Sequence, residues 1–417
     1  MRILILTQYF WPENFRVNDL TADFVERGHQ VTVLTGIPNY PAGKVFEEFR
    51  REPEKFADFH GAEIVRIPML ARGQGNLRLL ANYTSFVLSG LTLGAWKLRG
   101  RKFDVIFVFM ISPVTAVIPA IFQRWLKRAP LFVWILDLWP ETLEAVGVVR
   151  SPRLLALVGK LVSFIYRRTD HILVQSRSFM NNVRTYAGPE AQVSYFPGWA
   201  EPIFKRDLDT VEPAPEVQRF TDSFNVLFAG NVGEAQDFPA ILDAAEALAP
   251  ECQARILVVG NGRMTPWVEK EIARRRLGER VVLLGRFPLE RMPSFFKASD
   301  ALLVSLKKDK IFAMTVPGKV QSYLAAGVPL IGMLDGEGAK VIEESGAGLV
   351  APGSTGPAEG TAERRDRAVG AAVPLRRSHR ARRRPGRTDR RTGRWEARTR
   401  RRPRPPSAVD GGLGPAG

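Results

Sequence analysis

The chain has 417 residues, 45% hydrophobic and 10% aromatic, so it is long enough for two ordinary domains and is not disordered throughout. Its single cysteine, Cys252, excludes an internal disulfide framework and a cysteine-based zinc cluster, and its four histidines argue against a histidine-rich metal site. These counts favour a reducing, cytoplasmic compartment. The net charge of +17 suggests a nucleic-acid or lipid partner, but residues 354–417 hold 18 Arg against six acids and carry +12 of it.

Short apolar segments alternate with helical patterns from the first residues onward. Strands are predicted at 3–7, 29–35, 63–67, 105–109 and 131–136, with helices near 17–27 and 114–128. The same order returns after residue 224, with strands at 226–229, 255–259, 281–284, 301–305 and 330–333 and helices near 238–248, 266–276 and 317–326. This alternation predicts an α/β fold of two Rossmann-like, doubly wound domains in tandem.

The N-terminal residues are too soon polar for a secretory signal, and no segment reaches about 18–20 strongly apolar residues, so a membrane-spanning helix is not expected. Prolines and charges interrupt the periodicity between the two runs of strands. We therefore predict an N-terminal domain at 1–198, a linker at 199–223, a C-terminal domain at 224–353 and a tail at 354–417.

The tail differs in composition from the rest of the chain. It has no Lys, Ile, Phe, Tyr, Met, Asn or Gln and only two leucines, Leu375 and Leu413, so we expect disorder. One hypothesis is a basic tail that binds nucleic acid or an anionic surface. The other is a shifted reading frame in a GC-rich gene, because the missing residues are mostly those with A/T-rich codons. In that case the C-terminal domain is incomplete.

Residues 79–96 form an apolar, aromatic-bearing helix that is followed by a cationic cluster at 97–102. A helix in a membrane interface has this pattern, with Trp96 at headgroup level and Lys97 on anionic phosphates. A helix buried between domains has the same pattern. Arg66, Arg72 and Arg78 are candidates to extend the basic face.

The most informative segment is 315–331, TVPGKVQSYLAAGVPLI. Pro317 suits the first position of a helix and Gly327 suits a left-handed stop, so a helix of about ten residues precedes a strand. Lys319 then lies in the first turn, beside unpaired amides and the positive end of the helix dipole. An anion such as phosphate would satisfy both the lysine and the amides. The alternative interpretation is an ordinary lysine exposed to solvent on the surface.

Several motifs in order resemble one family. They are TQYFWPENFRVN at 7–18, VLTGIPNYPAGK at 33–44, DLWPE at 137–141, FAGNVGEAQD at 228–237, VPGKVQSYLAAGVP at 316–329 and DGEGAKVIEESG at 335–346. Together they are similar to the family 4 nucleotide-sugar glycosyltransferases, in the bacterial surface-polysaccharide branch of fucosamine and colanic-acid transferases. The resemblance spans residues 1–350 and ends near residue 353.

The resemblance implies the GT-B arrangement, in which two Rossmann-like domains face across a cleft. It implies a retaining glycosyltransferase that needs no metal and no cofactor and uses a nucleoside-diphosphate sugar, with UDP favoured over GDP. The expected acceptor is a polyprenyl-diphosphate-linked or other glycan acceptor, at the inner face of the plasma membrane. The alternatives are a GT-B UDP-N-acetylhexosamine epimerase and a nucleic-acid or anionic-surface binder.

Transfer of a sugar requires that the charge of the leaving diphosphate be neutralised, here by helix amides and cations. Besides Lys319 and the amides of Val316, Gly318 and Lys319, we expect donor contacts from turns and loops in the C-terminal half. The predicted donor-binding residues are Gly230, Asn231, Gly233, Arg263, Arg286, Phe287, Lys319, Gly336, Glu337 and Gly338. Arg286 and Phe287 are expected at the nucleobase, and Glu337 at the hydroxyls of the donor sugar.

The chain departs from the family pattern at four positions. Family members usually have an Arg and a Lys near the turn after residue 229, and two glutamates around the later helix. Here Asn231 and Gln236 lie near the cationic positions, while Met314 and Ser322 stand where the glutamates fall. The phosphate role therefore shifts to Lys319, with Arg263 as a second cation.

Asp137 is the predicted catalytic residue, because it ends a buried strand among aromatic residues, where open sheets place their ligands. Such surroundings raise the pKa of a carboxyl, which suits a proton acceptor or a sugar-hydroxyl anchor. An N-cap of the following helix is the competing role. On the acceptor side we predict Glu13, Asn14, Arg16, Asn39 and Lys44.

Overall fold

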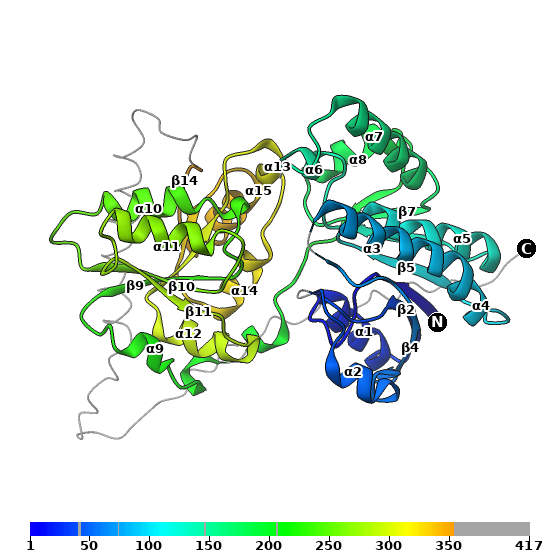
Figure 1. The fold of residues 1–417 in the computed structure, drawn as a ribbon, viewed down its shortest axis with the longest axis horizontal. Helices are drawn as coiled ribbons and strands as arrows, with labels where there is room; N and C mark the ends of the chain where they lie inside the picture. Colours follow the sequence, from blue (N-terminus) through cyan, green and yellow to red (C-terminus); the bar gives the residue numbers. More distant parts are fainter. Residues whose placement is uncertain (41–42, 74, 146, 206, 354–417) are drawn as a thin grey trace, which may run out of the picture. The chain divides into compact units, whose positions relative to one another are not determined.

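The computed structural model describes residues 1–40, 43–73, 75–145, 147–205 and 207–353. The predictions for the tail at 354–417 lie outside the described residues. The described residues form two sheets whose strands run mainly parallel (Figure 1). The two-sheet α/β architecture predicted from the alternation is confirmed.

The first sheet has the strand order β3-β4-β2-β1-β5-β6-β7-β8, and only the β3–β4 pair is antiparallel. Its strands are β1 (Arg2–Leu6), β2 (Gln30–Gly36), β3 (Asp58–Phe59), β4 (Ala62–Ile67), β5 (Val105–Met110), β6 (Leu131–Ile135), β7 (His171–Val174) and β8 (Val193–Tyr195). The order reverses at β1, between β2 and β5. Ligands of open α/β sheets bind at the carboxyl ends of strands where such a reversal occurs.

Helices cover both faces of this sheet. The helical segments are α1 (Arg16–Glu26), α2 (Glu47–Arg51), η1 (Pro53–Phe56), α3 (Asn76–Ser89), the π-helical turn η2 (Gly90–Gly94), α4 (Ala95–Lys97), η3 (Val114–Val117), α5 (Ile118–Lys127), α6 (Glu141–Ala145), α7 (Pro152–Tyr166) and α8 (Phe179–Ala187). Side chains alternate along β1, so that Ile3 and Ile5 pack towards α1 while Leu4 and Leu6 pack in the core that includes residues of α3, α5 and α7. The helix predicted at 114–128 is split into η3 and α5.

The second sheet is parallel throughout, in the order β11-β10-β9-β12-β13-β14. Its strands are β9 (Phe224–Ala229), β10 (Ala254–Val259), β11 (Val281–Gly285), β12 (Ala301–Ser305), β13 (Leu330–Met333) and β14 (Gly348–Ala351). Here the order reverses at β9, between β10 and β12. The loops after β9 and its neighbours are therefore the place to look for a ligand.

The helical segments of this half are η4 (Pro202–Lys205), η5 (Leu208–Thr210), α9 (Pro215–Gln218), η6 (Glu234–Gln236), α10 (Phe238–Glu246), α11 (Thr265–Arg274), η7 (Leu289–Arg291), α12 (Met292–Ala298), α13 (Lys310–Ala313), α14 (Gly318–Ala326) and α15 (Glu337–Ser345). Helices α10 and α11 pack on one face and α12, α14 and α15 on the other. The segment predicted as a linker, 199–223, contains η4, η5 and α9, and Phe204 and Val217 are buried in the core of the second sheet.

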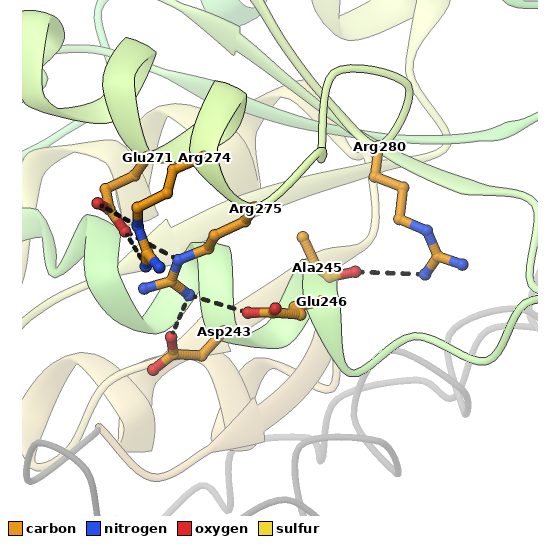
Figure 2. Close-up of polar contacts among 7 residues, drawn as sticks. All are labelled: Asp243, Ala245, Glu246, Glu271, Arg274, Arg275 and Arg280. Atoms are coloured by element: carbon orange, nitrogen blue, oxygen red, sulfur yellow. Dashed lines mark hydrogen bonds and ion pairs between the residues drawn. The ribbon is translucent and has the colours of Figure 1, made fainter.

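Ion pairs hold α11 against α10, which lie side by side on the sheet (Figure 2). Arg275, the residue just after α11, donates to Asp243 at 2.6 Å and to Glu246 at 3.2 Å, both on α10. It also donates to Glu271, on α11, at 3.0 Å. The Arg275 side chain is only 14% exposed, so its charge is better shielded from solvent than that of an isolated surface pair. This network belongs to the helix layer and not to the pocket described next.

Candidate active site

A pocket of about 1080 Å³ opens at the carboxyl ends of β9, β10 and β11. Its lining includes Arg16, Tyr40, Glu201, Phe204, Ala229, Gly230, Asn231, Val259, Gly260, Asn261, Gly262, Arg286, Phe287, Leu289, Met292, Phe296, Gly318, Lys319, Ser322 and Tyr323. The pocket therefore lies beside the reversal point of the second sheet, where an open α/β sheet binds its ligands.

Lys319 is the most unusual residue of this pocket. Its Nζ is buried and has no hydrogen-bond partner among the described residues, and it lies 3.4 Å from the centroid of the Phe228 ring. Removal from water lowers the pKa of Lys319 to about 7. A cation–π contact offsets only a small part of the desolvation cost of a buried ammonium. The Lys319 side chain therefore lacks a counter-charge among the described residues, and the alternative of a solvated surface lysine is wrong.

The start of α14 explains how Lys319 comes to this place. Pro317 is extended, with φ −60° and ψ 136°, and is the N-cap, so the helix begins at Gly318. The prediction that Pro317 is the first helical residue is wrong by one position, because its ψ is still that of a strand. Lys319 remains in the first turn, where backbone amides have no intrahelical acceptor. The helix ends as predicted at Gly327, which has φ 66°.

Two glycines bring the backbone close to this lysine. Gly230 has φ 141°, and a Cβ there would lie 2.6 Å from Cε of Lys319. Gly260 has φ 143°, and its Cβ would lie 1.8 Å from the carbonyl oxygen of Gly230. Both backbone conformations are rare for other residues. Gly230 was predicted from its place in a turn after a strand, whereas no pattern in the sequence pointed to Gly260.

Tyr323 fixes the end of β9 beside Lys319. Its hydroxyl accepts from the amide of Ala229 at 3.0 Å and donates to the carbonyl of the same residue at 3.1 Å. The residue is 1% exposed. These bonds hold the β9 turn against α14, and no pattern in the sequence pointed to Tyr323.

Arg16, predicted on the acceptor side, lines the same pocket as Lys319. It begins α1, donates from Nη2 to the carbonyl oxygen of Gly318 at 2.9 Å, and its Nη2 lies 3.7 Å from the Glu201 carboxylate. The guanidinium therefore reaches the opening of α14. The acceptor role predicted for Arg16 stays a prediction.

The structure brings four further predicted residues to the lining. Gly230 and Asn231 follow β9, while Arg286 and Phe287 follow β11. The Phe287 ring packs on Phe295 at 4.7 Å between centroids, so it belongs both to the core margin and to the pocket. This arrangement is compatible with the expected place of a nucleobase, which stays a prediction.

Five predicted donor residues are not in the lining. Arg263 is exposed on the surface, although its neighbour Gly262 lines the pocket. Gly233 faces the side chains of Asn231 and Gln236. Gly336 and Gly338 allow close backbone packing, since a Cβ at Gly336 would lie 1.9 Å from the Ala313 carbonyl oxygen and one at Gly338 would lie 2.9 Å from Pro317 Cδ. The loop 335–338 thus supports the segment that leads into α14.

Glu337 makes protein contacts and does not line the pocket. It begins α15, and its Oε1 accepts a hydrogen bond from the Ser178 hydroxyl at 2.8 Å and pairs with Lys340 at 3.5 Å. A side chain held in this way is not directed at the pocket around Lys319. The expected role of residues 335–338 in lining the sugar pocket, with Glu337 at the sugar hydroxyls, stays a prediction.

Glu13 and Asn39 are buried and tie two loops of the first sheet together. Oε1 of Glu13 accepts from the amides of Asn39 at 2.7 Å and Tyr40 at 2.6 Å, and Oε2 accepts from the amide of Phe10 at 3.1 Å. Burial raises the pKa of Glu13 to about 7, although these amides oppose the shift. The Asn39 amide oxygen accepts from the amide of Arg72 at 2.8 Å. These contacts define positioning roles, and the acceptor roles stay predictions.

Asn14 and Lys44 are both exposed. Arg66 does not extend an outward basic face, because it donates to the carbonyl oxygens of Gly36 and Trp11 and burial lowers its pKa to about 10. The Arg66 side chain instead bridges the loop that follows β1 and the last residue of β2.

Asp137 follows β6, as predicted. Desolvation raises its pKa to about 6. Helix α6 begins at Glu141, four residues after Asp137, so Asp137 does not occupy the N-cap position of this helix. The competing N-cap role is therefore not seen. Asp137 is not in the lining of the Lys319 pocket. A metal-binding group of three or more His, Cys, Asp or Glu side chains is not found among the residues that the structure describes.

Comparisons with known proteins agree with this architecture. Residues 14–199 match the "Glycosyl transferase 4-like domain" and residues 223–364 match "Glycosyl transferases group 1". The chain is 25% identical over 353 residues to the putative colanic acid biosynthesis glycosyl transferase WcaI of Escherichia coli strain K12, covering 78% of this chain and 82% of that protein.

Solved glycosyltransferases share the fold at low identity. Anabaena HepE, solved in complex with UDP-glucose, superposes with a TM-score of 0.58 at 15% identity and covers 90% of this chain and 91% of its own. WaaG, a glycosyltransferase of lipopolysaccharide biosynthesis, gives a TM-score of 0.59 at 14% identity, with 91% and 92% covered. These two structures confirm the predicted GT-B fold class. With both domain matches in order, the chain belongs to the family 4 glycosyltransferases of GT-B fold and is a glycosyltransferase.

Proposed function

We propose that this glycosyltransferase transfers a sugar, with retention of anomeric configuration, from a UDP-sugar to a lipid-linked or other glycan acceptor in surface polysaccharide biosynthesis. One observation carries the donor part of the proposal: the Lys319 ammonium is buried without a hydrogen-bond partner at the opening of α14, among the residues that the structure describes. A diphosphate supplies the missing counter-charge.

Sugar transfer requires that the negative charge developing on the leaving diphosphate be stabilised. The Lys319 side chain and the amides of Gly318 and Lys319 are held in place before the ligand arrives, and the bound diphosphate favours the charged form of the lysine. Gly230 and Gly260 admit the ligand close to the backbone. Arg286 and Phe287, further along the same lining, would take the base.

The donor and acceptor classes rest on likeness to relatives. HepE was solved with UDP-glucose and WcaI bears a colanic acid biosynthesis name, which supports UDP and a polysaccharide acceptor for this chain. Retention, the absence of an essential metal and a polyprenyl-diphosphate carrier follow from the family resemblance alone. Asp137, with its pKa of about 6, is mostly ionised near pH 7 and would accept a proton or anchor a sugar hydroxyl.

The direct test of this proposal is sugar transfer by the purified chain. We expect UDP release from one or more UDP-sugars to depend on added polyprenyl-diphosphate-linked glycan, with mass spectrometry showing the acceptor heavier by one sugar. UDP release from none of the UDP-sugars, with turnover of a GDP-sugar, would reject the donor assignment.

Exposed apolar side chains on helices that cover the first sheet support a peripheral membrane location. Ten exposed apolar side chains lie on the segments from α3 to α4, on α5 and on α7; they are Leu77, Leu80, Leu88, Leu93, Trp96, Trp125, Leu126, Leu154, Leu157 and Phe164. The three helices cover the same face of the sheet. No Asp or Glu occurs at 75–103, 105–136 or 145–169, whereas Lys and Arg are frequent there.

Exposed apolar side chains among cations suit a surface of anionic lipid headgroups. Within the described ranges, no helix has both the length and the apolar character needed to cross a bilayer. We therefore propose attachment by this face, at the cytoplasmic side of the inner membrane. The alternative of a helix buried between domains does not fit Leu77 and Trp96, which are 84% and 60% exposed.

Vesicle flotation tests the membrane face. Replacing Trp96 and Trp125 with serine is expected to lower partition onto phosphatidylglycerol-containing vesicles about tenfold, because two large amphipathic rings leave the interface. Trp125 is 72% exposed, so the change should leave the melting temperature nearly unaltered. Val148→Ser, at an exposed residue outside these helices, is the control. Equal flotation of the double variant and the wild type would count against the proposal.

A further inference from the structure

Glu201 introduces a negative charge into a pocket that is otherwise positive. The lining includes three cationic residues, Arg16, Arg286 and Lys319, and Glu201 is the acidic residue among them within the described part of the chain. Glu201 lies between β8 and η4, outside every motif identified in the sequence. Its side chain is 24% exposed, so part of the carboxylate remains accessible from the pocket.

The carboxylate is held in a defined position. Its Oε2 accepts a hydrogen bond from the Ser322 hydroxyl at 2.7 Å, and its Oε1 lies 3.7 Å from Nη2 of Arg16. Ser322 is three residues after Lys319, and side chains at that spacing lie on the same face of a helix, about one turn apart. Glu201 is therefore placed about one helical turn from the proposed diphosphate site.

A carboxylate repels phosphate, so Glu201 is suited to a part of the donor that offers hydrogen-bond donors. The ribose next to the diphosphate has two neighbouring hydroxyls, and a carboxylate has two acceptor oxygens with room for several bonds. We propose that Glu201 accepts hydrogen bonds from the ribose 2′- and 3′-hydroxyls and makes the pocket selective for ribonucleotides. This inference rests on the proposed function, because it requires a nucleoside diphosphate at Lys319.

A purely structural role is the competing explanation, in which Glu201 only orients Arg16 and Ser322. The two roles differ in what they do to ligands that lack a hydroxyl. If Glu201 binds the ribose, its removal abolishes the difference between UDP and its deoxy analogues. If Glu201 only holds other residues in place, its removal weakens all three nucleotides by the same factor.

The experiment is a calorimetric titration of UDP, 2′-deoxy-UDP and 3′-deoxy-UDP into the wild type and Glu201→Ala. For the wild type we expect each missing hydroxyl to weaken binding about tenfold. For Glu201→Ala we expect UDP to bind about tenfold or more weakly, and the three ligands to agree within about twofold. Ser322 keeps a hydrogen bond to the Gly318 carbonyl at 3.2 Å in the variant, so α14 should remain intact.

Glu246→Ala is the matched control, because Glu246 is a 57% exposed carboxylate on α10 that pairs with Arg275 away from the pocket. It should show the wild-type preference for UDP. A Glu201→Ala variant that keeps the full penalty for each missing hydroxyl overturns the inference and leaves the proposed function standing. A wild type that binds none of the three nucleotides removes the proposed function and this inference with it.

Discussion

Replacing Lys319 with methionine is expected to weaken UDP binding by about 100-fold and, without nucleotide, to make the protein more stable. Methionine keeps the length of the buried chain but removes an ammonium that has no hydrogen-bond partner among the described residues. A hydrogen bond to a charged group contributes about 1.5–3 kcal/mol, which corresponds to roughly 10- to 100-fold in affinity. A buried, unpaired charge costs stability, so its removal is stabilising.

The pH dependence of stability should separate this charge effect from simple packing. The pKa of Lys319 falls from its ordinary 10.5 to about 7 in the folded protein, so between pH 7 and 10.5 the unfolded chain binds more protons than the native one. The free energy of unfolding contributed by this group therefore rises with pH in that window. The stability gain of Lys319→Met should shrink from pH 7 to pH 9 in urea denaturation.

Lys270→Met, at an exposed lysine of α11, is the control and should alter neither UDP affinity nor its pH dependence. Calorimetry on both variants measures the affinities. Unchanged UDP affinity in Lys319→Met would reject the assignment of the diphosphate to this lysine.

Gly260→Ala should lower the free energy of unfolding strongly, by about 3 kcal/mol or more. The new Cβ would lie 1.8 Å from the carbonyl oxygen of Gly230, and the residue has φ 143°, so both a backbone clash and backbone strain result. Relief of the clash requires one of the two turns to move, and the turn after β9 also lies against Lys319. We therefore expect weaker UDP binding in whatever fraction remains folded.

Gly278→Ala is the matched control for this loss. A Cβ at Gly278 would meet no atom within 4 Å, so the free energy of unfolding should stay within about 1 kcal/mol of the wild type. Urea denaturation of both variants measures the difference. If Gly260→Ala were as stable as Gly278→Ala, the close approach of the two turns would be wrong.

The parts of the fold predicted from sequence are those with strong local signals. Strands β9, β10 and β12 are long, apolar and central, and their predicted and observed bounds agree within two residues. Strands β7 and β8 were not predicted, because they are short, near an edge and only partly buried. Helix α14 was predicted from its proline and glycine signals, with an error of one residue at its start.

In the candidate site, too, the residues predicted from sequence are those with a local signal. Lys319 and Gly230 follow local signals, a helix start and a turn after a strand, and both line the pocket. Glu201 and Tyr323 depend on contacts between residues 121 and 94 positions apart in the chain, which no local pattern reveals. The bond from Arg16 to the Gly318 carbonyl joins residues 302 positions apart, so the sequence did not reveal that Arg16 reaches the start of α14.

Proton uptake on UDP binding is the most direct test of the diphosphate site. At pH 8 the Lys319 amine, with its pKa of about 7, is mostly neutral in the empty protein, and a bound diphosphate should protonate it. Calorimetric titration in two buffers of different ionisation enthalpy should give an uptake of nearly one proton for the wild type and none for Lys319→Met. No uptake by the wild type, or an equal uptake by both proteins, would contradict a diphosphate held by Lys319.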